Sequence, residues 1–210
     1  MSDSHGKLPS LDMLGEFDII VHSGDFLPTK GRRMGERIRP VAEIRVQERW
    51  LRKKKEEIRV WSRGKRILFC RGNHDFVRPE AWLREEIDFV NITDKLHEEG
   101  GISFYGFPYI PYDDGEWVGE LRDPLLLEEV RKIPKVNVLV AHCPPHGILD
   151  MEEGVRWGNK PLLDEFEKVR PQDRPRVILC GHVHDSCGVT RWGPIYVINS
   201  ATTARLVHVG

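Results

Sequence analysis

The chain has 210 residues, of which 40% are hydrophobic and 31% are charged, and its formal net charge is -1. A chain of this length and composition is expected to fold as one domain over residues 1–210 and to bury roughly 70% of the surface that it exposes when unfolded. The balanced charge argues against a wholly basic nucleic-acid-binding protein. No apolar run approaches the ~18 residues of a membrane span and no signal peptide is recognisable, so we expect a soluble cytoplasmic protein.

Helical and strand patterns alternate along the chain, which implies a layered α/β domain. The segment 109–122 has no clean period and is expected to be a loop near a site, where its aromatic residues either stack on a nucleobase or simply pack on the surface. The four cysteines form no Cys-x-x-Cys pair and are expected to be buried free thiols. The predicted helices cover 8–14, a stretch from 40 onward, 81–86, 123–130 and 161–169, and the predicted strands cover 17–24, 67–70, 89–92, 102–107, 136–141, 176–180 and 195–198, with weak pairing at 207–209.

One segment is strongly basic. Fifteen Lys or Arg and five Glu lie between Lys30 and Arg66, a local excess of +10. Ile44, Leu51 and Ile58 repeat every seven residues within it, which predicts a helix with one buried stripe and a broad basic face. We interpret this helix as a crossover connection whose Lys and Arg stems lie over the sheet. The alternative is an electrostatic patch for polyanions, nucleic acid included.

Several predicted strands end in residues that bind metal ions. In open α/β sheets, ligands bind just beyond the carboxyl ends of the strands, so polar residues at these positions indicate a site. An Asp-x-His block at the start of the chain adds two further candidates. Imidazole, carboxylate and amide oxygen without thiolate suit manganese, iron or zinc, and seven ligands suit two ions that lie ~3.5–4 Å apart and share one carboxylate. The seven candidate ligands are Asp3, His5, Asp25, Asn73, His142, His182 and His184.

A single histidine at a strand end is more often a hydrogen-bonded structural residue than a metal ligand. Five short blocks in a fixed order are much harder to explain in that way. The blocks are Asp3-Ser4-His5, Gly24-Asp25, Gly72-Asn73-His74-Asp75, His142 and Gly181-His182-Val183-His184.

These blocks resemble the signature of the calcineurin-like metallophosphoesterases. The segments 103–108, 142–147 and 196–201 are similar to the small single-domain, metallophosphoesterase-domain-containing branch, which is related to class III cyclic nucleotide phosphodiesterases. The resemblance implies a layered α/β/β/α fold, in which a two-sheet sandwich is flanked by helices.

The resemblance also implies roles for the seven ligands. One ion would be held by Asp3, His5, Asp25 and His184, and the second by Asp25, Asn73, His142 and His182, with Asp25 as the bridge. Two divalent ions are therefore the expected cofactors, with manganese as the first choice and iron, zinc or magnesium as alternatives. They would neutralise the oxygens of a phosphoester and activate a water for attack on phosphorus.

His74 is the expected general acid for the leaving group. Many relatives carry an aspartate that orients this histidine, but here Pro28 stands at that position. Asp75 or a backbone carbonyl is then expected to orient His74.

The expected function is hydrolysis of a phosphodiester or phosphomonoester of nucleotide size. The alternatives are a nuclease or nucleic-acid end-processing enzyme with the same centre, and a non-catalytic scaffold that retains the fold.

The first strand departs from the family pattern. In the family a buried strand precedes the Asp-x-His block, whereas here only Met1 and Ser2 precede Asp3. We therefore expect a truncated first strand and a frayed terminus that weakens the ion bound by Asp3 and His5. We also expect the native gene product, or an earlier start codon, to supply several more apolar residues.

Overall fold

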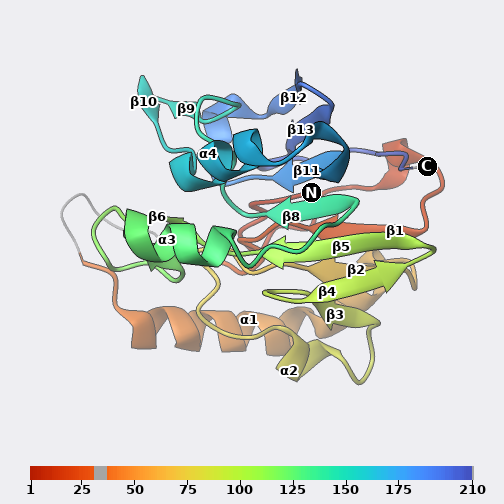
Figure 1. The fold of residues 1–210 in the computed structure, drawn as a ribbon. Helices are drawn as coiled ribbons and strands as arrows, with labels where there is room; N and C mark the ends of the chain where they lie inside the picture. The colour runs from red at the N-terminus through yellow and green to blue at the C-terminus, as the bar shows by residue number, and fades with distance from the viewer. Residues whose placement is uncertain (31–36, 210) are drawn as a thin grey trace.

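A computed structural model describes residues 1–30 and 37–209. Two β-sheets pack face to face, and helices cover their outer faces (Figure 1). The order of layers is helix, sheet, sheet, helix, so the predicted α/β/β/α sandwich is confirmed. Within the described residues, no helix is both long enough and apolar enough to cross a membrane.

The smaller sheet is parallel and contains β1 (Ile19–His22), β2 (Arg66–Phe69) and β3 (Phe89–Asn91) in that order. Its outer face is covered by α1 (Pro40–Trp61) and α2 (Glu80–Leu83). Leu51 and Ile58 of α1 are fully buried in the core cluster that also contains Ile67 and Phe69 of β2. The predicted apolar stripe of the basic helix is therefore the surface that packs on this sheet.

The larger sheet has the strand order β12-β13-β11-β8-β5-β4. Its four inner strands run parallel, and an antiparallel strand closes each edge. The outer face is covered by α3 (Asp123–Val130) and α4 (Lys160–Lys168), whose buried leucines share a core cluster with the sheet. The strands are β4 (Leu96–Glu99), β5 (Ile102–Phe107), β8 (Val138–Ala141), β11 (Val177–Cys180), β12 (Gly188–Trp192) and β13 (Ile195–Asn199).

A third core cluster lies between the two sheets. It joins Leu68 of β2 to Phe104, Val138, Val140 and Ile198 of the larger sheet. Strands that are buried on both faces read as continuous apolar runs, which is why β2 and β8 stand out in the sequence. This packing fixes the two sheets against each other.

Several short elements were not predicted. β4 and β12 are polar edge strands, and the small pairs β6 (Ile110–Pro111) with β7 (Glu120–Leu121) and β9 (Met151–Glu152) with β10 (Val155–Arg156) lie in segments without a clean period. The predicted helix over 8–14 was wrong, since only the 3-10 turn η1 (Asp12–Leu14) forms there. The remaining 3-10 turns are η2 (Pro171–Asp173) and η3 (His184–Ser186), and residues 207–209 form no strand.

The first residues of the chain are held between the two sheets, so the prediction of a frayed terminus was wrong. The Met1 amino group donates to the Val21 carbonyl (2.9 Å), and Ser23 N–H donates to the Met1 carbonyl (2.9 Å). On the other side, Ser2 forms a parallel bridge with Ala201. Asp3 is only 2% exposed because backbone hydrogen bonds on both sides of this segment fix its path.

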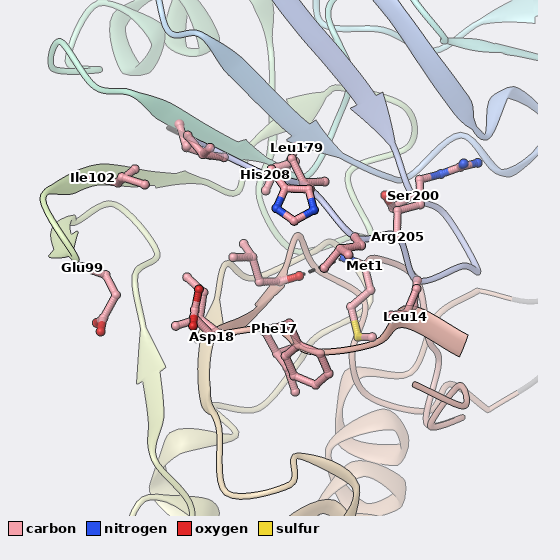
Figure 2. A pocket seen from close by; sticks show the side chains of 18 of the residues that line it. Met1, Leu14, Phe17, Asp18, Glu99, Ile102, Leu179, Ser200, Arg205 and His208 are labelled. Atoms are coloured by element: carbon pink, nitrogen blue, oxygen red, sulfur yellow. Dashed lines mark hydrogen bonds between the residues drawn. The ribbon is translucent and has the colours of Figure 1, made fainter. Parts of the chain in front are cut away.

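A cavity of about 490 Å³ continues from Met1 along β1. Figure 2 shows Leu179 and His208 on one side of Met1 and Phe17 on the other. The cavity is lined by β1, by apolar side chains of the larger sheet and by residues 204–209, and its lining contains no candidate metal ligand. It therefore lies apart from the strand ends that carry polar residues.

The cysteines agree with the expectation of free thiols. Cys70, Cys143 and Cys180 are buried, Cys187 is partly exposed, and all four are unpaired. Burial raises the pKa of the Cys180 thiol and keeps it protonated at neutral pH.

Candidate metal centre

The predicted ligands meet at the carboxyl ends of β1, β2, β8 and β11. Three overlapping groups of side chains each bring their ligand atoms within 4.8 Å of one another, and Asn73 joins them through contacts with His142 and His182. All seven candidate ligands and His74 therefore lie in one cluster. The three groups are Asp3, His5 and His184; His5, Asp25 and His74; and Asp3, Asp25 and His142.

Asp25 lies at the centre of this cluster. Its Oδ2 atom is 3.6 Å from Nε2 of His142, 3.9 Å from Nε2 of His5 and 3.9 Å from Nε2 of His74. Its other oxygen, Oδ1, accepts a hydrogen bond from the backbone N–H of His74 (2.8 Å). One oxygen is therefore engaged by the loop after β2, while the other faces three imidazoles.

Asp3 joins the start of the chain to the loop after β11. Its two carboxylate oxygens accept the N–H of His182 at 3.1 Å and 2.9 Å, and Oδ1 lies 3.4 Å from Nε2 of His184. Burial opposes the ionisation of Asp3, but the hydrogen bond with His184, the charge of His142 and the hydrogen bond with Ser2 together outweigh it, so the pKa of Asp3 lies below its usual value. The same hydrogen bond raises the pKa of His184.

His142, Asn73 and His182 form the other side of the cluster. Nδ1 of His142 is 2.8 Å from the Ser23 carbonyl oxygen, which assigns the proton to Nδ1. The lone pair on Nε2 then faces Asn73 Oδ1 at 2.7 Å, and Nδ1 of His182 approaches the same oxygen at 3.1 Å. A metal ion bound by these atoms would explain why several acceptors converge here. The contact between Nδ1 of His142 and the Ser23 carbonyl fits the same interpretation, because the second ring nitrogen of a metal-bound histidine usually donates to a carbonyl.

The buried histidines are suited to bind a cation. Burial lowers the pKa of His5 to about 4, of His182 to about 3 and of His74 to about 2. These imidazoles are therefore neutral at pH 7 and carry a free lone pair. Nδ1 of His5 and Nδ1 of His74 are buried without a hydrogen-bond partner in the described chain.

The carboxylates point to the same conclusion. Burial raises the pKa of Asp25 well above its usual value, and the negative charges of Asp3 and Asp75 act in the same direction. Buried carboxylates that repel one another become stable as anions when a cation lies between them. With neutral imidazoles and an amide oxygen beside them, this donor set fits divalent metal ions.

The backbone is strained where it presents these ligands. Asp3, His5, Asp25 and His182 all have positive φ, at 52°, 44°, 57° and 68°. Residues other than glycine rarely adopt this conformation, and it is concentrated at functional sites. The hydrogen bonds that Asp3 and Asp25 make are what hold the strained loops in place.

Two motif glycines lie so close to metal-ligand side chains that no Cβ atom would fit. A Cβ atom on Gly24, whose φ is +108°, would lie 2.5 Å from Nδ1 of His142. A Cβ atom on Gly181 would lie 2.0 Å from Oδ2 of Asp3. The glycines of Gly-Asp and Gly-His-x-His therefore make room for ligands that come from other strands.

Asp75 does not orient His74 as expected. Its oxygens accept the backbone N–H groups of Asp25 (2.8 Å), Leu27 (2.9 Å) and Gly72 (2.9 Å). These bonds use the carboxylate to tie the loop after β1 to the loop after β2. The prediction failed because the sequence places Asp75 next to His74 but does not show which way each side chain points.

Sequence reasoning also missed contacts that come from distant segments. The Trp117 ring lies 4.1 Å from the His74 ring, between ring centroids. Gln47 of α1 is fully buried and makes hydrogen bonds to the loop that carries His74. A polar residue within the apolar stripe of the helix was the signal that could have identified Gln47.

Comparisons with known proteins identify the family. A sequence model of the calcineurin-like phosphoesterase family matches residues 1–186. UPF0046 protein C25E10.12 of Caenorhabditis elegans is 28% identical over 226 residues, which cover 96% of this chain and 73% of the relative. Metallophosphoesterase domain-containing protein 1 of Homo sapiens is 23% identical over 234 residues, which cover 96% of this chain and 64% of the human protein. The chain therefore belongs to the calcineurin-like phosphoesterase family.

Proposed function

We propose that this chain hydrolyses a phosphodiester or phosphomonoester of nucleotide size at a centre for two divalent ions. The observation that carries the proposal is the position of Asp25. One oxygen of its carboxylate, Oδ2, lies 3.6 Å from Nε2 of His142 and 3.9 Å from Nε2 of both His5 and His74, as the oxygen of a bridging ligand would. Two overlapping groups of imidazole and carboxylate donors share Asp25, and a set of this size suits two ions better than one.

We divide the residues between the two ions as the family resemblance implies. We assign Asp3, His5 and His184 to one ion and Asn73, His142 and His182 to the other, with Asp25 shared. Ions held there would supply positive charge to the ester oxygens and would lower the pKa of a nearby water. Manganese is our first choice, because the donor set of nitrogen and oxygen atoms suits it.

His74 is the residue to which we assign proton donation to the leaving oxygen. Its Nε2 is 3.9 Å from Oδ2 of Asp25, and its ring lies against Trp117. Burial keeps the free imidazole neutral, but an anionic phosphoester beside it would favour the protonated form.

A substrate panel tests the proposal. Purified protein with added Mn²⁺ would be assayed on bis-p-nitrophenyl phosphate, p-nitrophenyl phosphate and 2',3'-cyclic AMP. We expect hydrolysis of at least one of them, and the pattern separates diesterase from monoesterase activity. Lack of hydrolysis on all three would contradict the proposal and favour the non-catalytic scaffold.

A nuclease or end-processing enzyme is the second candidate, because of the excess of +10 between Lys30 and Arg66. Part of this charge is paired at the surface, since Lys54 contacts Glu57 and Lys55 contacts Glu86 (2.8 Å). If the surface binds nucleic acid, reversing the charges of Arg52 and Lys53 should weaken polynucleotide binding and flatten its salt dependence. Hydrolysis of a small diester should be unchanged. Binding that is equal in the variant and in the wild type would remove this candidate.

A further inference from the structure

The buried stripe of α1 contains a glutamine whose side-chain amide makes four hydrogen bonds. Gln47 is 0% exposed. Its Nε2 donates to the His74 carbonyl (2.6 Å) and to the Pro28 carbonyl (3.3 Å), while its Oε1 accepts the N–H groups of Phe76 (2.9 Å) and Val77 (3.2 Å). A carboxamide has two donor hydrogens and one acceptor oxygen with two lone pairs, so its full capacity is directed at two loops of the site.

These contacts fix the backbone on both sides of His74. The N–H of His74 donates to Asp25 Oδ1 (2.8 Å), and its carbonyl accepts from Gln47. The imidazole itself has a buried Nδ1 without a hydrogen-bond partner in the described chain, and its ring packs on Trp117. The direction of the His74 side chain is therefore set by its backbone and by packing.

The helix gives this anchor its rigidity. Gln47 lies one turn from Leu51, which is fully buried against the smaller sheet. A displacement of the 74–77 loop would leave carbonyl and N–H groups without hydrogen-bond partners, which is unfavourable. The same carboxamide also binds the Pro28 carbonyl of the loop after β1.

We propose that Gln47 is a positioning residue that holds His74 at the angle needed to protonate the leaving group. The inference rests on the proposed function, in which His74 is the proton donor. Gln47 acts through the backbone of the 74–77 loop and does not touch the substrate. Its loss should therefore affect the step that depends on His74 more than substrate binding or metal binding.

Two variants and one control test the proposal. Gln47→Met keeps the length of the side chain and removes all four hydrogen bonds. Gln47→Glu keeps an acceptor for Phe76 and Val77 but removes the amide donor to His74, and it serves if Gln47→Met does not fold. Glu43→Gln is the control, because Glu43 lies one turn earlier on the same buried stripe and accepts from the Lys30 N–H (2.8 Å).

The measurements are the metal content of each protein and its kcat and KM on two phosphoesters of the same charge. One ester has a p-nitrophenyl leaving group and the other has an alkyl leaving group. A poor leaving group needs the proton, whereas p-nitrophenolate leaves without it. We expect kcat on the alkyl ester to fall about tenfold or more in both Gln47 variants, because misplacement of a catalytic group by about 1 Å can cost 10²-fold. KM, metal content and the rate on the p-nitrophenyl ester should stay within about threefold, and Glu43→Gln should match the wild type.

Other outcomes would overturn the proposal in distinguishable ways. Equal losses on both esters, or lost metal, would make Gln47 a structural residue of the loop. Unchanged kcat on the alkyl ester would show that His74 needs no anchor from α1. A wild-type chain that is inactive on both esters would overturn the proposed function itself. Hydrogen exchange of the Phe76 and Val77 amides in Gln47→Met would then report only the structural effect of the substitution.

Discussion

Asp25 and His74 lie in the same cluster but are assigned different tasks. Asp25 faces three imidazoles, whereas His74 has a ring nitrogen without a partner in the described chain. We expect Asp25→Asn to lose metal and turnover together. His74→Asn should keep its metal and lose about 10²–10⁴-fold in turnover, the usual value of general acid catalysis. Metal analysis by mass spectrometry checks both variants, and a depletion of His74→Asn as severe as that of Asp25→Asn would contradict the separate roles.

The pH dependence of stability tests whether the buried histidine His22 is neutral in the folded chain. His22 is fully buried, its Nδ1 accepts the N–H of Gly24 (3.3 Å) and its Nε2 contacts Ser4 Oγ (3.1 Å). Burial, with a smaller effect from the Met1 amino group, lowers the pKa of His22 well below 6.5. As the pH falls through 6.5, the unfolded chain therefore binds a proton at His22 while the folded chain does not. The contribution of neutral His22 to the free energy of unfolding is present above pH 6.5 and is lost as the pH falls below it.

The measurement is urea unfolding of the chelator-treated wild type and of His22→Asn. We expect the difference between their unfolding free energies to shrink as the pH falls from about 7 to about 5, by up to about 1.4 kcal/mol per pH unit. His208→Asn, a substitution of an exposed histidine, is the control. A difference that does not change with pH would show that the His22 ring takes up its proton in the folded chain.

At the residue scale the sequence was informative where a ligand follows directly on a strand. Asp25, His142 and His182 were found in this way, because an apolar run that ends in a polar residue is visible locally. The partners of Asp75 and Gln47 were not found, because each depends on the direction of a side chain that bridges segments far apart in the chain.

At the scale of elements, the segment beside β1 departs most from expectation. Residues 1–3 pair with β1 and with the region of Ala201, and the cavity of about 490 Å³ continues along the same edge of β1. Burial lowers the pKa of the Met1 amino group to about 6, so folding removes a charge from water at this point. An apolar segment joined to the chain in place of Met1 would move the charged amino group away from this point. Such a segment could pair with β1 and fill the cavity.

The corresponding experiment joins Met-Lys-Ile-Leu-Val-Ile to Ser2. We expect the melting temperature to rise by about 2–4 °C for each kcal/mol gained from buried apolar area. The same extension with serine in place of the apolar residues is the matched control. An apolar extension that gives no rise over the serine control would contradict the idea that this edge of β1 accepts a strand.

The elements themselves differ in how well the sequence predicts them. β5 was predicted with its observed bounds, because a buried apolar run carries a strong pattern. β4 was missed because its sequence Leu96-His97-Glu98-Glu99 is polar, and it forms by antiparallel pairing with β5. Edge strands of this kind are stabilised by their neighbour and leave little local signal.

At the scale of the whole molecule, the sandwich brings the carboxyl ends of both sheets to one place. β1 and β2 of the smaller sheet supply Asp25 and Asn73, while β8 and β11 of the larger sheet supply His142 and His182. The fold class followed from the alternation of strands and helices together with the family resemblance. The way the two sheets face each other depends on packing that no local pattern reveals.

A metal shared by the two sheets should also stabilise the molecule as a whole. Bound metal stabilises the folded chain by an amount that grows with the logarithm of its free concentration divided by the dissociation constant, about 2.7 kcal/mol when this ratio is about 100. We expect Mn²⁺ to raise the melting temperature of the chelator-treated protein, and to do so less in Asp25→Asn. An equal rise in both proteins would place the stabilising ion elsewhere.

The most direct test of the proposed centre is the rate of phosphoester hydrolysis as Mn²⁺ is added stepwise to the metal-free chain. Because Asp25 is assigned to both ions, activity should need both sites to be filled. The account predicts hydrolysis of bis-p-nitrophenyl phosphate that rises steeply and saturates at two equivalents of metal per chain, with no comparable activity in Asp25→Asn. Full activity at one equivalent, or no hydrolysis at any ratio of metal to chain, would contradict it.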